Sequence, residues 1–413
     1  MSGPLVVIGA GQAGFQLADS LRQAGFAEPI FLIGEEDHAP YHRPPLSKAY
    51  LKEAKTPDSL FVRPQAYLSA NRIELIPGRR ATAIERSEKR VLLAGGQQVA
   101  YDHLVLATGV RNRQMDVPGV ELAGVVNLRT IADAEHMRDQ LSGAEHVVII
   151  GAGFIGLEVA AAVRRQGVHI TIVEAADRPM QRAVGPQTST FFRQAHERAE
   201  ISFRFGATVV RFHGEGGRVR SVELGDGHKL NADVVLVAIG VIANSELASE
   251  AGLAVAGGIV VDEFLGTADP HIFAIGDCAL HPNSFAPHPV RIESVQNAVD
   301  QARALAARLG GAADRPYHAV PWFWSDQGAL KLQIAGLGHG IDRRVLRGDP
   351  EAGAFSVFGF ADDRLVSVES VMRAADHMAA RKLLLEAIPI SPDEAADPAC
   401  DLRSLVMARG RGR

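Results

Sequence analysis

The chain has 413 residues, a length that predicts two or three domains. Its apolar fraction of 47% is typical of a globular protein, and its net charge of -5 gives no general attraction to nucleic acid. No uninterrupted apolar run reaches the roughly 20 residues of a membrane-spanning helix. A glycine-rich motif starts too near the first residue to leave room for a signal peptide. We therefore expect a soluble, cytoplasmic protein that binds neither nucleic acid nor membrane.

The first motif is a strand, a glycine turn and a helix. Residues 5–8 form an apolar run typical of a strand buried on both faces, and apolar spacing predicts a helix over 13–21. Between them, three glycines have G-x-G-x-x-G spacing: Gly9, Gly11 and Gly14. A second strand, 30–33, precedes Glu35, where a carboxylate suits an adenosine ribose. This context predicts dinucleotide binding, the alternative being a tight structural turn.

The same unit occurs a second time. An apolar strand over 147–150 is followed by a helix to about 165, and a further strand over 170–173 ends at Glu174, 18 positions after Gly156. The second glycine loop contains Gly151, Gly153, Ile155 and Gly156. Two complete copies predict two dinucleotide sites. Glu174 favours NADH because its charge repels a 2′-phosphate, although Arg178 lies close enough in sequence to weaken this argument.

Three further apolar strands end in small residues, which permit close approach of backbone or ligand. These strand ends carry Thr108 and Gly109, then Gly240, then Gly276 and Asp277. Asp277 is either a helix N-cap or a carboxylate that binds a polyol chain. The parallel between the first two ends extends the repeat to its last strand.

A rigid loop follows Glu35. Pro44 and Pro45 keep the chain extended, and Ser47 is a candidate cap for the helix that follows. From spacing alone, Lys48 is an exposed lysine on this loop. Glu158, on the helix after the second glycine loop, is equally consistent with an ordinary solvent-facing position.

The C-terminal part has a different character. We expect a helix over 291–309, followed by antiparallel strands over 330–337, 343–346 and 355–360. Both tryptophans lie in 321–326, and a local apolar core is one explanation for them. Residues 409–413 are expected to be a frayed terminus.

The chain has two cysteines, Cys278 and Cys400, which are far apart in sequence. A disulfide framework, a zinc site and a C-x-x-C redox pair all need spacings that are absent here. We therefore predict no metal site and no redox-active dithiol.

Taken together, the two fingerprints and the strand ends 107–109, 238–240 and 275–277 resemble the two-dinucleotide-fold, glutathione-reductase-like flavoprotein superfamily. The strings over 43–48, 293–298 and 321–327 resemble the NADH-dependent ferredoxin reductases of bacterial oxygenase systems. The resemblance implies an α/β fold with two Rossmann-like domains and a C-terminal α+β domain. It implies an FAD domain over 1–112 and 243–319, an NADH domain over 113–242 and a C-terminal domain over 320–413.

The resemblance also implies roles for single residues. Non-covalent FAD would be held by residues of the first fingerprint and of later segments: Gly9, Gly11, Ala13, Gly14, Glu35, Lys48, Ala81, Arg129, Asp277 and Val295. Further cofactor-binding residues, with no cofactor specified, would be Arg43, Thr108, Gly109, Gly240, Gly276 and Trp324. NADH would be held by the second fingerprint, Glu158 and Glu174. Lys48 and Glu158 would pair on the nicotinamide side of the flavin, with Trp324 beside the ring.

The implied activity is hydride transfer from NADH to FAD and single-electron transfer to a [2Fe-2S] ferredoxin that serves a haem monooxygenase or ring-hydroxylating dioxygenase. Arg63 and Arg303 are candidate docking charges for an acidic ferredoxin, or ordinary solvated arginines. The alternatives are a rubredoxin reductase, an NADH diaphorase and a redox signalling flavoprotein that resembles apoptosis-inducing factor.

Overall fold

The computed structural model describes residues 3–53, 55–312 and 314–410. The chain divides into two compact units, each discontinuous in sequence. The first contains Met1–His42, Thr56–Arg111 and Ile242–Phe323, and the second contains Arg43–Lys55, Asn112–Val241 and Trp324–Arg413. No helix of the described part is long and apolar enough to cross a membrane.

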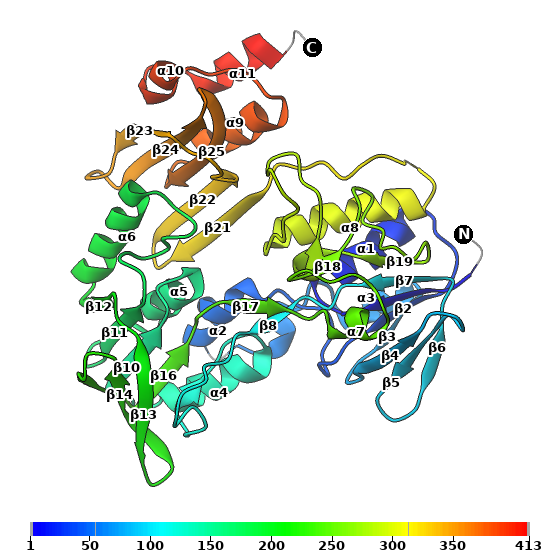
Figure 1. The fold of residues 1–413 in the computed structure, drawn as a ribbon, viewed down its shortest axis with the longest axis horizontal. Coiled ribbons are helices and arrows are strands. Elements are labelled where there is room, and N and C mark those ends of the chain that lie inside the picture. The colour runs from blue at the N-terminus through cyan, green and yellow to red at the C-terminus, as the bar shows by residue number, and fades with distance from the viewer. Residues whose placement is uncertain (1–2, 54, 313, 411–413) are drawn as a thin grey trace. The chain divides into compact units, whose positions relative to one another are not determined.

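The first unit is built on a five-stranded parallel sheet in the order β19-β7-β1-β2-β3. Its strands are β1 (Leu5–Ile8), β2 (Ile30–Ile33), β3 (Ile73–Ile76), β7 (His103–Leu106) and β19 (Ile272–Ala274). All four residues of β1 and the last three of β7 are exposed by 6% or less, because the sheet is covered on both faces. Helices α1 (Gln12–Gln23) and α8 (Val295–Leu309) pack against each other on this sheet (Figure 1).

Smaller elements complete this unit. They are the antiparallel sheet of β4 (Ala81–Glu85), β5 (Arg90–Leu93) and β6 (Gln98–Ala100), the strands β18 (Ile259–Val260) and β20 (Ala279–Leu280), the helices α3 (Gln65–Ala70) and α7 (Glu246–Glu250), and the 3-10 turns Pro57–Leu60 and Gly276–Cys278. The chain leaves the unit through β8 (Val110–Asn112) and returns through β17 (Val241–Ala243).

The second unit repeats this strand order in four of its five strands; the fifth, β9, precedes the fingerprint strand in the chain, whereas β19 follows β7. Its parallel sheet has the order β12-β11-β10-β16-β9, with the fingerprint strand again in the middle. The strands are β9 (Val125–Val126), β10 (His146–Ile150), β11 (His169–Glu174), β12 (Ile201–Phe205) and β16 (Val234–Val237), with helices α4 (Ile131–Leu141), α5 (Phe154–Val163) and α6 (Pro186–Arg198). An antiparallel sheet of β13 (Val209–Glu215), β14 (Arg218–Leu224) and β15 (Lys229–Asn231) corresponds to β4-β5-β6. The predicted internal repeat is therefore present in the fold.

From Trp324 onward, the second unit also contains the C-terminal sheet, in the order β21-β22-β25-β24-β23. Its strands are β21 (Trp322–Gln327), β22 (Leu330–Gly336), β23 (Arg343–Asp349), β24 (Ala354–Ala361) and β25 (Arg364–Val371), and the helices that follow are α9 (Ala374–Leu385), α10 (Pro392–Ala396) and α11 (Leu402–Gly410). The pairings β22–β25, β25–β24 and β24–β23 are antiparallel, as predicted.

The second unit also includes the turn Pro44–Ser47 and the short helix α2 (Ala49–Lys52), which we expected in the first domain. This segment packs on α4 and α5. For example, the Tyr50 hydroxyl donates a hydrogen bond to Glu135 over 3.0 Å. The three-domain boundaries given above stay a prediction.

Two local expectations were wrong. Helix α8 begins at Val295 and not at Arg291, because Ser294 is its N-cap and accepts a hydrogen bond from the Asn297 backbone N–H. The expected frayed terminus begins too early, since Arg409 lies in α11 and pairs with Glu394. Residues 411–413 lie outside the described part of the chain.

Candidate functional site

The first glycine loop has two closely packed glycines and an open one. A Cβ on Gly9 would lie 2.1 Å from the Ala107 carbonyl oxygen, and a Cβ on Gly14 would lie 2.0 Å from the Gly9 oxygen. A Cβ on Gly11 would meet nothing within 4 Å among the described residues. Gly9 and Gly14 therefore hold the turn against β7 and α1 against β1, while the backbone at Gly11 is left accessible. These are the features that a bound pyrophosphate requires.

The second loop repeats this geometry. A Cβ on Gly151 would lie 2.4 Å from the Ala238 oxygen, and a Cβ on Gly156 would lie 2.1 Å from the Gly151 oxygen. Gly153 again faces open space in the described structure, at the N-terminus of α5. Ile155, in the first turn of that helix, keeps 45% of its surface exposed. Both loops thus fit a dinucleotide, which supports the prediction of two sites.

The two acids after the second strands differ in their surroundings. The Glu174 carboxylate accepts backbone hydrogen bonds from Ala152 over 2.7 Å and from Ala176 over 2.8 Å, so it holds the glycine loop itself. The Glu35 side chain is 70% exposed and lies 3.6 Å from the Arg80 guanidinium. Each acid sits at the end of its strand, where the sequence placed it, and their ribose contacts stay predictions.

The Arg178 guanidinium is hydrogen-bonded to backbone carbonyls in this structure. It donates hydrogen bonds to the Val184 carbonyl over 2.9 Å and to the Gln181 carbonyl over 3.2 Å. Burial lowers the pKa of Arg178, and the charge of Arg344 acts in the same direction. In the sequence, the nearby Arg178 weakened the argument that Glu174 favours NADH. Because backbone carbonyls already bind this guanidinium, the objection is smaller in the structure.

Four other predicted cofactor-binding residues follow strands of the first sheet, Thr108 and Gly109 after β7 and Gly276 and Asp277 after β19. The Thr108 hydroxyl donates to the Asn244 carbonyl over 2.6 Å, so it also ties the returning chain to the outgoing one. Asp277 lies inside a 3-10 turn whose N-cap is Ile275, so it is not the helix cap that we considered. Val295 opens α8, and Ala81 opens β4. A carboxamide oxygen of Gln12, in the first turn of α1, is buried with no protein partner in the described chain.

The second unit contains an ion pair between a half-buried lysine and a buried glutamate. The Lys48 ammonium lies 2.6 Å from the Glu158 carboxylate, and the exposed fractions of the two side chains are 21% and 3%. Glu158 is therefore not on the solvent side of α5, and Lys48 is not the freely exposed lysine that spacing alone suggested. The pair confirms that these residues are neighbours, whereas their contact with cofactors stays a prediction.

Two serine hydroxyls also donate hydrogen bonds to the Glu158 carboxylate. Ser47 donates to one carboxylate oxygen over 2.6 Å, and Ser325 donates to the other over 2.7 Å. The prediction that Ser47 caps a helix was wrong, because no side chain caps α2 and the Ser47 hydroxyl is used by Glu158 instead. Sequence analysis missed Ser325 as a site residue.

The loop over residues 43–48, called the lysine loop below, is held at its N-terminal end by the rest of the second unit. The Arg43 guanidinium donates to the Arg129 carbonyl over 2.7 Å, and the Arg129 backbone N–H donates to Asp133 over 2.9 Å. Two residues predicted from the resemblance thus contact each other. Trp324 is half-buried in β21, next to Ser325, and Gly240 is exposed after β16.

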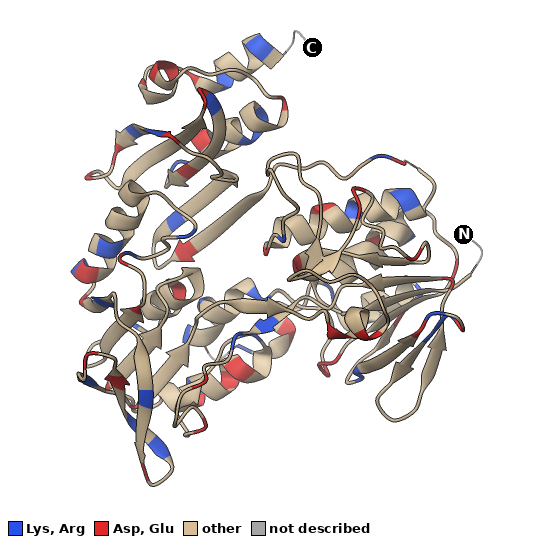
Figure 2. Cartoon of the chain, in the orientation of Figure 1, with Lys and Arg blue, Asp and Glu red and all other residues tan. Residues whose placement is uncertain are grey.

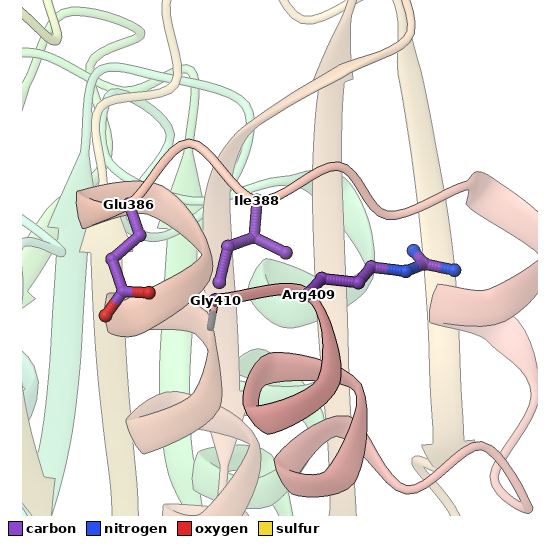
Figure 3. A pocket seen from close by; sticks show the side chains of 4 residues that line it. All are labelled: Glu386, Ile388, Arg409 and Gly410. Atoms are coloured by element: carbon purple, nitrogen blue, oxygen red, sulfur yellow. The ribbon is translucent and has the colours of Figure 1, made fainter. Parts of the chain in front are cut away.

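A separate cavity carries no recognisable chemistry. It has a volume of about 390 Å³ and is lined by Glu386, Ile388, Arg409 and Gly410 (Figure 3). The Arg409 guanidinium is already bound to the Pro389 carbonyl and to Glu394. No group of three or more His, Cys, Asp or Glu residues in the described chain is arranged to hold a metal ion.

Comparison with known proteins identifies the family. Residues 3–302 match the pyridine nucleotide-disulphide oxidoreductase family, and residues 322–406 match the reductase C-terminal family. The chain belongs to the pyridine nucleotide-disulphide oxidoreductase family. Within it, the chain is similar to ferredoxin reductases along nearly its whole length.

Three relatives illustrate this similarity. Rhodocoxin reductase of Rhodococcus erythropolis is 49% identical over 405 residues, which cover 98% of this chain and 94% of the relative. The structure of the ferredoxin reductase for the CYP199A2 system from Rhodopseudomonas palustris is 48% identical, with a TM-score of 0.95 and coverage of 98% and 99%. The reductase in a covalent putidaredoxin reductase-putidaredoxin complex is 39% identical, with a TM-score of 0.95 and 99% coverage of both chains.

These findings confirm several predictions. The superfamily, the fold class and the ferredoxin-reductase type are as the motifs indicated. The chain is an oxidoreductase of a family whose ferredoxin reductases use FAD and NADH, which confirms the predicted cofactors. The individual contacts to these cofactors are not part of that confirmation.

Proposed function

We propose that this chain is an NADH-dependent ferredoxin reductase that supplies electrons, one at a time, to a [2Fe-2S] ferredoxin of a bacterial oxygenase system. The ion pair between Lys48 and the buried Glu158, in the same compact unit as the second glycine loop, is the observation that carries the proposal. Bound FAD would supply the step from a two-electron hydride donor to a one-electron acceptor.

The residues of the chain then have defined tasks. The loops at Gly11 and Gly153 bind the two pyrophosphates, and Glu174 favours an unphosphorylated ribose. Lys48 would place a positive charge next to the flavin, which gains negative charge when it accepts a hydride, and Glu158 holds that ammonium. Trp324 lies on the route by which we expect electrons to leave.

The acceptor has to be outside the chain because no internal dithiol is available. Cys278 is completely buried, and burial raises the pKa of its thiol, which makes it unreactive. Cys400 is also a free cysteine, and it lies in the C-terminal segment of the other unit. A dithiol relay of the kind used by disulfide reductases is therefore not part of this proposal.

For docking, we propose that basic side chains attract an acidic ferredoxin. Figure 2 shows basic and acidic residues interspersed in both units, so the attraction would be local. Arg63 and Arg303 are both exposed, and the Arg63 guanidinium lies 5.6 Å from the centre of the Tyr67 ring. Reversing the charge at Arg303 should slow ferredoxin reduction and weaken its salt dependence, whereas unchanged turnover would remove Arg303 from the docking surface.

The proposed function is tested by anaerobic stopped-flow mixing of the FAD-loaded enzyme with NADH, and separately with NADPH, followed by a two-iron ferredoxin. Rapid flavin bleaching by NADH, slower bleaching by NADPH and fast ferredoxin reduction are expected. If the flavin bleaches while the ferredoxin stays oxidised, the ferredoxin assignment fails. Rubredoxin and a dye acceptor in the same assay distinguish the rubredoxin reductase and diaphorase alternatives.

Because the electron donor is NADH, we place the activity in the cytoplasm. A redox signalling role would instead require that reduction changes binding to a macromolecule, and fast turnover with ferredoxin would count against it. Among the alternatives, rubredoxin reductase has weaker support than ferredoxin reductase, because the relatives with higher identity are ferredoxin reductases.

A further inference from the structure

A chain of buried polar side chains continues from Glu158 into the C-terminal sheet and to α6. Ser325 donates to Glu158 over 2.7 Å, and the Gln327 amide lies 3.3 Å from the Ser325 hydroxyl oxygen. The Gln327 carbonyl oxygen lies 2.8 Å from Nε2 of His196. Ser325, Gln327 and His196 are exposed by only 0%, 3% and 4%, so water does not compete for these hydrogen bonds.

The direction of each hydrogen bond in this chain can be assigned. Burial lowers the pKa of His196, with the Gln327 hydrogen bond opposing, so the ring is neutral at neutral pH. The Gln327 oxygen can only accept, which makes His196 Nε2–H the donor. The Gln327 amide then donates to Ser325, and the Ser325 hydroxyl donates to Glu158. Every donor therefore points toward the Glu158 carboxylate.

The other carboxylate oxygen has a different pair of donors. Ser47 and Lys48 both bind Oε2 of Glu158, each over 2.6 Å, while Ser325 binds Oε1. One oxygen thus belongs to the lysine loop, and the other is held by the C-terminal strand. Without Ser325, the carboxylate could turn about its terminal bond, and the Lys48 ammonium would follow it.

The strand β21 is suited to this task by its two-residue periodicity. Ser325 and Gln327 share one face, which is buried, whereas Trp324 and Asp326 lie on the other and are half-buried. The strand that carries Trp324 is thereby tied to the helix that carries Glu158. A C-terminal strand thus becomes part of the support for the ion pair in the NADH-binding half.

We propose that Ser325, held in place by Gln327 and His196, is a positioning residue that fixes the Glu158 carboxylate and, through it, the Lys48 ammonium for NADH oxidation. This inference rests on the proposed function, because it assumes that the Lys48–Glu158 pair faces the nicotinamide. If Ser325 acts only through Glu158, its substitution should have no effect once the Glu158 carboxylate is removed. The experiment tests this dependence.

The experiment compares flavin reduction by NADH in the FAD-loaded wild type and in Ser325→Ala, Glu158→Gln and the double variant. Ser325→Ala should reduce the limiting rate roughly tenfold, which corresponds to about 1.4 kcal/mol of barrier. In the Glu158→Gln background, the same change should have almost no further effect. Equal effects in both backgrounds, or a wild-type rate in Ser325→Ala, would overturn the proposal.

Ser356→Ala is the matched control. Ser356 is also fully buried in the C-terminal sheet, and its hydroxyl also donates to a carboxylate, that of Asp376, over 3.0 Å. This variant should lose stability as Ser325→Ala does but keep its limiting rate within about twofold of wild type. A rate loss equal to that of Ser325→Ala would show that the effect is general destabilisation.

Two measurements do not depend on turnover. The dissociation constant for tetrahydro-NADH, a non-reacting analogue, should change less than threefold in Ser325→Ala, because the loss lies in positioning and not in binding. The imidazole ¹⁵N spectrum, assigned with His196→Gln, should show His196 as the neutral Nε2–H form. A charged ring or the Nδ1–H form would refute the assigned direction of the chain.

If Ser325→Ala fails to retain FAD, Gln327→Met provides a second test. It keeps the volume of the side chain and removes the donor to Ser325, and a two- to threefold loss of rate is expected. An unchanged rate would then overturn the proposal. If wild-type enzyme itself is not reduced by NADH, the proposed function fails first, so the two failures are distinguishable.

Discussion

Substitutions of the middle and the last glycine of the second loop, Gly153 and Gly156, should affect nucleotide binding and folding separately. In Gly153→Ala, the new Cβ meets nothing within 4 Å in the described structure, and the backbone at that position has an ordinary extended conformation with φ of -77°. We therefore expect the free energy of unfolding to change by less than about 0.5 kcal/mol. In Gly156→Ala, the Cβ would lie 2.1 Å from the Gly151 carbonyl oxygen, so strand and helix have to move apart. A loss of about 3 kcal/mol or more is expected.

Gly153→Ala, which should hardly change stability, should weaken dinucleotide binding. The methyl group of Gly153→Ala would occupy the space through which a pyrophosphate approaches the backbone. Loss of the hydrogen bond to a charged group contributes about 1.5–3 kcal/mol, so the dissociation constant should rise about 10- to 100-fold. Titration with tetrahydro-NADH and thermal unfolding of the same FAD-loaded samples measure both effects. A folded Gly153→Ala enzyme with wild-type affinity would refute the assignment of this loop to NADH.

Three further predictions concern the second unit. Lys48→Met should slow flavin reduction by NADH at least tenfold in stopped-flow experiments, because it removes the charge that Glu158 holds, and an unchanged rate would exclude this role. Arg347→Met should lower the free energy of unfolding by about 3 kcal/mol, because the guanidinium is 4% exposed and donates to the Cys400 carbonyl over 2.8 Å. Denaturant unfolding measures this loss, and Arg364→Met, at an exposed position, is the control. Burial and the charge of Arg381 lower the pKa of His377 to about 4, so the folded state resists protonation. Stability should therefore fall as pH decreases from about 6.5 toward 4, and His377→Leu should remove about 2 kcal/mol of this loss at pH 5, which melting curves at pH 7.5 and 5 would reveal.

The sequence predicts the parts of this fold that have a local signature. Each fingerprint combines a buried strand, fixed glycine spacing and a helix within a short stretch of chain, so both loops could be located without a structure. The start of α8 was placed too early because the apolar pattern does not mark where the N-cap, Ser294, interrupts it. The antiparallel strands were recognised, but β25 and α9 were not.

The hydrogen-bond network around Glu158 has no such signature. Ser325 is 167 positions from Glu158, and Gln327 is 131 positions from His196. A serine and a glutamine at alternate positions of a strand are ordinary in sequence, and only the fold shows that their face is buried. Lys48 and Glu158 themselves came from the resemblance, since their spacing equally allowed two solvent-exposed residues.

The discontinuous arrangement of the chain has a consequence for synthesis on the ribosome. When residue 241 has emerged, all five strands of the second parallel sheet are present, whereas the first sheet still lacks β19. The helix α8, which covers α1, comes later still. The sheet whose strands start earlier in the sequence is therefore the later of the two to be completed. A nascent chain has to leave one edge of β7 unpaired until residue 274 has been made, and α1 uncovered by α8 until residue 309 has been made.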